Sequence, residues 1–75
     1  MRFQRVGSKN LWLQCDLEAD ADIQWIMSYD TVIGYLDHRF NRLVTSYYHY
    51  SPTTSKHITT LCNRFGYERL DIDEL

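Results

Sequence analysis

One stretch, Ser51 to Gly66, constrains the fold of this chain more than any other, because it carries a complete set of helix signals. Hydroxyl residues and a proline open it, and these residue types are typical of helix N-termini. Apolar residues then recur at the i, i+3, i+4 and i+7 spacing of one helical face. That face consists of Ile58, Leu61, Cys62 and Phe65. Glycine readily takes the left-handed conformation that ends helices, so we expect the helix to close at Gly66.

The chain before this helix has the pattern of β-strands. Alternating apolar and polar side chains are typical of a strand with one buried face. Segments with this alternation, or rich in β-branched and aromatic residues, are 3–6, 11–17, 23–28, 31–37 and 42–50. We therefore expect an α+β fold: a small antiparallel β-meander of three to five strands with one C-terminal helix packed across one face. The length of 75 residues fits a single domain, residues 1–75.

Three local features allow more than one interpretation. Tyr29 and Asp30 form a hairpin turn, with Asp30 at positive φ, or they lie inside one long bent strand. Gly34, in the middle of a strand, marks a bulge or a close approach of another backbone. We favour the close approach, with Val32, Gly34 and Leu36 facing the helix. The C-terminal segment 67–75 is a short edge strand or a frayed end, and its acidic residues favour the frayed end.

A single helix covers only one face of such a sheet. Tyr35 and Tyr47, with Trp12 as a further candidate, are then left on the other face. An uncovered aromatic face predicts a homodimer or a surface for a partner. The alternative is that the tail and the N-terminus fold over it.

The composition limits the classes of function. A formal net charge of −2 excludes a strongly basic protein that binds nucleic acid by bulk charge. No signal peptide and no run of apolar residues long enough for a membrane span is present, so we expect a cytoplasmic protein. Two cysteines are too few for a disulfide scaffold, and we expect both to be buried, reduced thiols.

Two short motifs resemble a family of small uncharacterised phage and prophage proteins. The first is Ser28-Tyr29-Asp30-Thr31, followed by an apolar strand. The second is the helix start, Ser51-Pro52-Thr53-Thr54-Ser55-Lys56-His57-Ile58. The resemblance spans residues 28–58 and implies a phage origin and an intracellular setting during infection. It implies no activity.

The helix start is also the best candidate binding site. Free N–H groups and the helix dipole favour an anion there, and hydroxyl and basic side chains add donors. The residues concerned are Thr53, Thr54, Ser55, Lys56 and His57. The alternative is that the hydroxyls only cap the helix. The histidines and cysteines lack the spacing of a metal site, no set of residues suits nucleophilic catalysis, and we expect no cofactor and no enzymatic activity.

The acidic residues fall into two runs, one at Asp16, Glu18, Asp20 and Asp22 and one at Glu68, Asp71, Asp73 and Glu74. They form solvated segments, or they imitate phosphates towards a basic protein surface.

We expect a non-enzymatic phage accessory protein that binds a host or phage macromolecule. One form of this function is the inhibition of a host defence system, as in anti-CRISPR proteins. A nucleic-acid-binding module and a structural homodimer are the alternatives.

Overall fold

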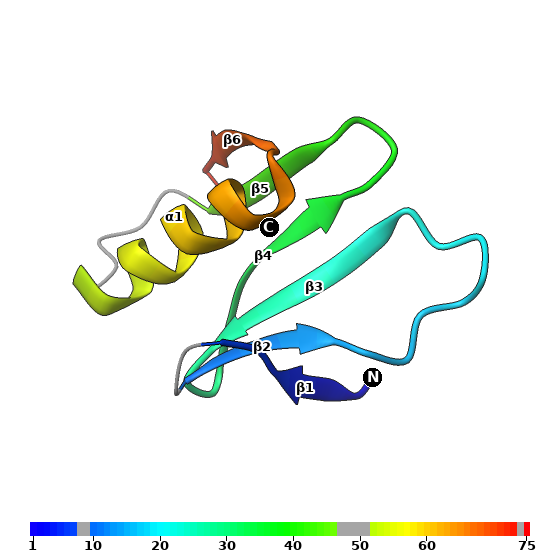
Figure 1. Cartoon of the computed structure of the whole chain (residues 1–75), viewed down its shortest axis with the longest axis horizontal. Coiled ribbons are helices and arrows are strands. Elements are labelled where there is room, and N and C mark those ends of the chain that lie inside the picture. The colour runs from blue at the N-terminus through cyan, green and yellow to red at the C-terminus, as the bar shows by residue number, and fades with distance from the viewer. Residues whose placement is uncertain (8–9, 47–51, 74) are drawn as a thin grey trace.

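The computed structural model describes residues 1–7, 10–46, 52–73 and 75 of the chain. These residues form two layers, a six-stranded β-sheet and one helix that lies across one of its faces (Figure 1). The strands lie side by side in chain order. The elements are β1 (Phe3–Arg5), β2 (Leu11–Gln14), β3 (Ile23–Ser28), β4 (Thr31–Asp37), β5 (Arg42–Ser46), α1 (Pro52–Phe65) and β6 (Glu68–Ile72). The α+β class and the C-terminal helix are confirmed, whereas the expected three to five strands are in fact six.

The additional strand is β6, formed by the tail that its charges had suggested would fray. Strands β1 to β5 are antiparallel neighbours, but β6 pairs with β5 in parallel. Two adjacent parallel strands need a crossover connection, and α1 provides it. Within this pair Leu70 lies opposite Val44 and Ile72 opposite Ser46. The acidic residues of the tail are compatible with this role, because edge strands commonly carry charged side chains.

Helix α1 begins at Pro52 and ends at Phe65, as the sequence signals indicate. Gly66 has φ of 69°, and the N–H groups of Gly66 and Tyr67 both donate to the carbonyl oxygen of Cys62, at 2.8 and 3.2 Å. These hydrogen bonds satisfy a carbonyl at the helix end, and they explain why a glycine follows the last turn. Ser51, expected at the helix start, lies outside the described residues.

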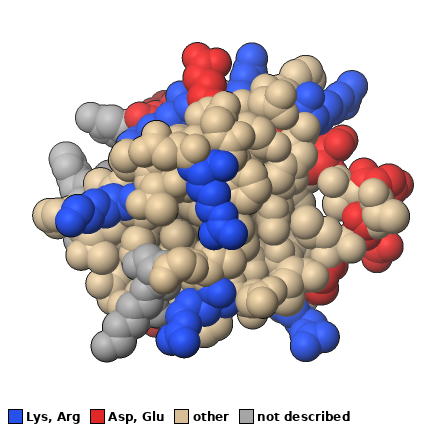
Figure 2. All heavy atoms as spheres, in the orientation of Figure 1, with Lys and Arg blue, Asp and Glu red and all other residues tan. Residues whose placement is uncertain are grey.

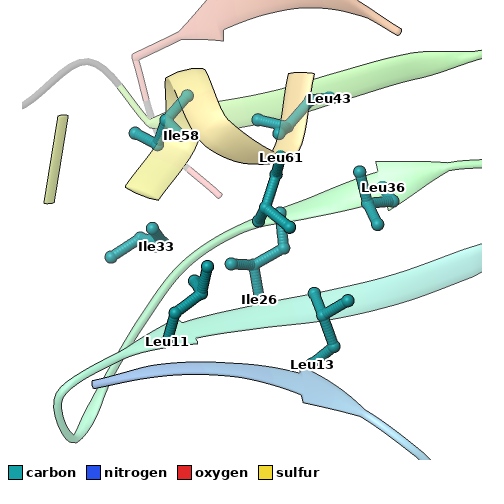
Figure 3. Packing of buried hydrophobic residues seen from close by; sticks show 8 residues of the cluster. All are labelled: Leu11, Leu13, Ile26, Ile33, Leu36, Leu43, Ile58 and Leu61. Atoms are coloured by element: carbon teal, nitrogen blue, oxygen red, sulfur yellow. The ribbon is translucent and has the colours of Figure 1, made fainter. Parts of the chain in front are cut away.

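The core lies between α1 and the sheet, and Figure 3 shows its side chains pointing toward one another from both layers. Of the predicted helix face, Ile58 and Leu61 are completely buried, while Cys62 and Phe65 are half-buried against the same cluster. The sheet contributes Leu11, Leu13, Ile26, Ile33, Leu36 and Leu43. Fully burying one such side chain stabilises the fold by about 1.5–3 kcal/mol, so this cluster holds the two layers together.

Strand β4 contains a β-bulge that changes which side chains reach the core. Ile26 lies opposite Gly34, but the next residue, Met27, lies opposite Val32, so that Ile33 is an extra residue. A bulge places an additional residue in one strand and interrupts the strict alternation of faces. As a result Ile33 is buried, whereas Val32 is 41% exposed. The prediction that Val32 faces the helix is therefore wrong.

Gly34 also marks a close approach, as predicted, but to a strand and not to the helix. A Cβ atom at this position would collide with the carbonyl oxygen of Val44 and would lie 3.0 Å from the Cα atom of Thr45. The backbone of β5 therefore occupies the space that a side chain would need. Leu36, on the same side of β4, is completely buried, which confirms its predicted place toward the helix.

The β3–β4 connection is a tight hairpin turn, because Ser28 and Thr31 pair directly across it. This excludes the long bent strand. The positive φ belongs to Tyr29, at 58°, and the prediction that Asp30 carries it is wrong. The backbone N–H of Tyr29 donates to the carbonyl oxygen of Asn10 at 2.8 Å, which holds the turn against the β1–β2 connection.

Candidate functional site

The face of the sheet opposite α1 is the main candidate for a contact surface. Residues paired in register share a face, and side chains alternate between faces along each strand. Because Ile26, Leu36 and Leu43 point to the helix, their strand neighbours point away from it. We call this side the open face, and its apolar residues are Phe3, Trp12, Ile23, Trp25, Met27, Val32, Tyr35, Val44, Leu70 and Ile72.

The centre of the open face is a continuous apolar row that crosses four strands. Trp25 pairs with Tyr35, Tyr35 with Val44, and Val44 with Leu70. The rings of Trp25 and Tyr35 meet edge to face, with centroids 5.2 Å apart and planes at 70°. Val44 is buried, the two rings are half-buried, and Leu70 is 41% exposed. The row is therefore held in place by its neighbours while part of it remains accessible.

The aromatic residues predicted for this face can now be placed. Tyr35 and Trp12 both lie on the open face and are half-buried. Tyr47 lies outside the described residues. Trp25 belongs to the same face, and the alternation of apolar residues in β3 was the signal that identifies it.

Charged side chains border the apolar row at one end of the open face. Asp37 pairs with Arg42 in register, and Arg42 pairs with Glu68. Arg5 lies on the same face at the opposite edge of the sheet, on β1. Among the strand residues that the structure describes, this face therefore carries charges of both signs, which suits a protein surface better than a polyanion.

The residues of the helix start are divided between the interior and the surface. Thr54 and His57 are buried, at 7% and 3% exposure, whereas Thr53, Ser55 and Lys56 are exposed. The structure therefore does not bring the five side chains together at one point. His57 instead forms a hydrogen bond to a strand, because its Nδ1 lies within reach of the Ser28 hydroxyl in β3.

A buried junction joins the helix start to β3. The Ser28 hydroxyl lies 2.9 Å from Nδ1 of His57 and shares a hydrogen bond of 3.2 Å with the Thr54 hydroxyl. Burial lowers the pKa of His57 from its ordinary value of 6.5, because the charged imidazolium loses hydration. The Tyr29 ring lies 6.3 Å from the His57 ring. The two sequence motifs thus meet in one place, through residues that are 26 and 29 positions apart in the chain.

A second polar network, which the sequence analysis missed, links β3, the end of β4 and the residue after Gly66. The Gln24 amide nitrogen donates to the carbonyl oxygen of Gln14 at 2.8 Å, so its oxygen is free to accept from Nε2 of His38, also at 2.8 Å. Nδ1 of His38 lies 2.7 Å from the Tyr67 hydroxyl. Because the amide oxygen of Gln24 can only accept, Nε2 is the nitrogen of His38 that donates to it. No local sequence pattern signals contacts between such distant positions.

The first acidic run occupies the β2–β3 loop. Figure 2 shows acidic side chains gathered at the end of the molecule where Figure 1 places this loop. A backbone hydrogen bond at Arg2, followed by the side-chain amide of Gln14, lowers the pKa of Asp16. Glu18, Asp20 and Asp22 are exposed, and no cluster of three potential metal ligands occurs among residues 1–7, 10–46, 52–73 and 75.

Both cysteines are free thiols, but they differ in exposure. Cys62 is half-buried on the core side of α1, and burial raises the pKa of its thiol. Cys15 is exposed, so the prediction that both are buried is wrong. The reason is that β2 ends at Gln14, and the alternation that would bury Cys15 does not continue.

Across the described part of the chain no pocket opens, and no helix there has the length and apolarity that crossing a membrane requires. The candidate site is therefore a surface. The fold and this surface define a small two-layer α+β domain with one open sheet face.

Comparison with known proteins assigns the chain to a family. It belongs to the family of unknown function DUF8033, whose model matches residues 3–74. No curated protein and no solved structure matches the chain. The match includes the residues of both motifs and the strands around them, but because the function of the family is unknown, it assigns no activity to the chain.

Proposed function

We propose that this is a non-enzymatic binding protein, a small phage-encoded accessory protein that acts in the cytoplasm of the host cell. Its open face binds a protein of the host or of the phage and thereby inhibits a host process such as a defence system. The phage setting follows from the resemblance of the two motifs around Ser28 and Thr54. The binding role follows from the open face itself.

One observation carries the proposal: the apolar row of Trp25, Tyr35, Val44 and Leu70 with exposed Val32 beside it. Exposed apolar patches of this kind mark interaction sites in soluble proteins. Trp and Tyr dominate the energetics of protein interfaces, because a large rigid ring is buried at low entropic cost. Charges of both signs at the border resemble the polar rim that surrounds such a centre.

The proposal is tested by affinity capture from infected host cells with matched surface variants. Val32 and Leu70 are each 41% exposed, so the double variant Val32→Glu/Leu70→Glu puts two charges on the open face without emptying the core. The control is Thr60→Glu/Asn63→Glu, which places the same charges on exposed positions of α1. We expect the wild type and the control to retain the same captured protein and the open-face variant to lose it.

Two results would contradict this function. One is capture of the same protein by the open-face variant at wild-type yield. The other is a mass by light scattering that shows a dimer for the wild type and a monomer for the open-face variant, because a second copy would then occupy the face. Circular dichroism of both variants establishes that they remain folded.

A further inference from the structure

The tip of the β4–β5 hairpin carries an exposed aromatic ring with two cations beside it. The Phe40 side chain is 58% exposed. The guanidinium carbon of Arg39 lies 5.2 Å from the centre of this ring and that of Arg42 lies 5.6 Å from it. Both distances are within the range of cation–π attraction. We call Arg39, Phe40 and Arg42 the tip cluster.

The backbone holds the tip cluster in a defined conformation. The Asp37 carboxylate accepts hydrogen bonds from the backbone N–H groups of Arg39 and Phe40, at 3.0 and 3.3 Å. Asn41 takes a positive φ of 55°, and its carbonyl oxygen accepts from the N–H of Glu68 at 3.2 Å. These contacts tie the loop to its own strand and to β6. A pre-organised loop loses less entropy when it binds.

Neither guanidinium group of the tip cluster forms an ion pair within the described part of the chain, where the ion pairs join the N-terminus to Asp16 and Arg69 to Asp71. Asp37 and Glu68 are the cross-strand neighbours of Arg42, and their charges offset part of its own. The guanidinium groups of Arg39 and Arg42 nevertheless lie near the same ring, where their like charges repel each other. An anion placed between them would accept hydrogen bonds from both guanidinium groups.

The tip cluster is continuous with the open face. Arg42 pairs with Asp37 and lies in β5 on that face. The next residue, Leu43, points to the helix and is buried in the core, so Arg42 points to the open side. A partner that covers the apolar row therefore reaches Arg42, and the tip extends beyond it. We propose that the tip cluster binds carboxylate side chains of an acidic segment of the partner protein. This inference rests on the proposed function, because it names the chemistry that the partner presents at one end of the open face.

The surroundings favour an acidic protein segment over a nucleic acid. The β2–β3 loop, with exposed Glu18, Asp20 and Asp22, lies at the same end of the sheet as the β4–β5 hairpin (Figure 1). A nucleic acid carries a charge at every nucleotide, so its chain would pass this acidic loop and be repelled. A short protein segment delivers one or two carboxylates at the tip alone.

A peptide titration tests the tip cluster without the partner. The probe is acetylated hexaglutamate added to the ¹⁵N-labelled protein, with amide signals followed by NMR at low salt. We expect saturable shifts confined to residues 37–42, and no shifts at these residues with hexalysine. The double variant Arg39→Gln/Arg42→Gln should weaken binding about five- to thirtyfold, as expected for two exposed ion pairs. The control Lys56→Gln/Arg64→Gln removes the same charge from α1 and should bind as the wild type does.

Several outcomes would overturn the inference. They are an absence of shifts at the tip, equal binding by the Arg39→Gln/Arg42→Gln variant, or tighter binding at the tip by a six-nucleotide oligothymidylate than by hexaglutamate. The last would identify the site as one for nucleic acid. None of these results bears on Val32 and Leu70, so failure of this titration and failure of the open-face capture experiment are distinguishable.

Discussion

Replacing Ser28 by alanine tests the junction that docks the start of α1 on β3. The Ser28 hydroxyl is 2% exposed and serves both Nδ1 of His57 and the hydroxyl of Thr54. Ser28→Ala removes one hydrogen-bond partner from each of two buried polar groups. Depriving a buried polar group of its hydrogen bond costs about 1–3 kcal/mol, so we expect a loss of about 2 kcal/mol in the free energy of unfolding. That is a large part of the roughly 4–11 kcal/mol available to a domain of this size.

Urea denaturation followed by tryptophan fluorescence measures the loss. With a slope of about 1 kcal/mol per molar for a small protein, the midpoint should fall by about 2 M. The control is Ser55→Ala, the same substitution at an exposed position of α1, which should stay within about 0.5 kcal/mol of the wild type. Adding Thr54→Val to Ser28→Ala should cost less than the sum of the single effects, because the two hydroxyls share one hydrogen bond. A midpoint for Ser28→Ala equal to that of Ser55→Ala would show that the Ser28 hydroxyl does not stabilise the fold.

Three further predictions concern the backbone, the buried histidine and the tail. Gly34→Ala should destabilise the fold by about 3 kcal/mol, since the new methyl group meets the backbone of β5; urea midpoints measure this, and a change below about 1 kcal/mol would contradict it. Because burial lowers the pKa of His57, this residue binds a proton less readily in the folded protein than in the unfolded chain. The contribution of neutral His57 to stability is therefore complete above pH 6.5 and declines as the pH falls toward the folded-state pKa. His57→Gln should make the free energy of unfolding less dependent on pH in this range, and an unchanged dependence would assign it to other groups. Amide hydrogen exchange should show protection at Leu70 and Ile72 in β6, and exchange at the rate of an unfolded peptide would show a frayed tail.

Features set by neighbouring residues could be predicted from the sequence. The helix was one of them, because its first-turn proline, its apolar spacing and Gly66 all lie within a single segment. The burial of Ile58 and Leu61 followed from the same spacing. The open face could be predicted because one helix covers only one face of a sheet. The alternation of side chains along the strands then assigned Tyr35 and Trp12 to this face correctly.

Features set by distant contacts could not be predicted in the same way. The tail becomes a strand only because α1 returns the chain to β5, and its own charges suggested the opposite. The bulge at Ile33 shifts the alternation of faces by one residue, which no local pattern announces. The helix start was assigned as one site because its residues are consecutive, but a helix turns consecutive side chains in different directions. Thr54 and His57 therefore point to Ser28, while Lys56 points to solvent.

Helix α1 covers one face of the sheet, and we propose that the partner covers the other. Hydroxyl-radical footprinting of the protein, alone and in complex with the captured partner, distinguishes the two faces. We expect Tyr35, Val32 and Leu70 to lose reactivity in the complex, while the exposed side of α1, at Thr60 and Asn63, stays as reactive as in the free protein. Protection on α1 with unchanged reactivity at Val32 and Leu70 would show that the partner binds the helix and not the open face.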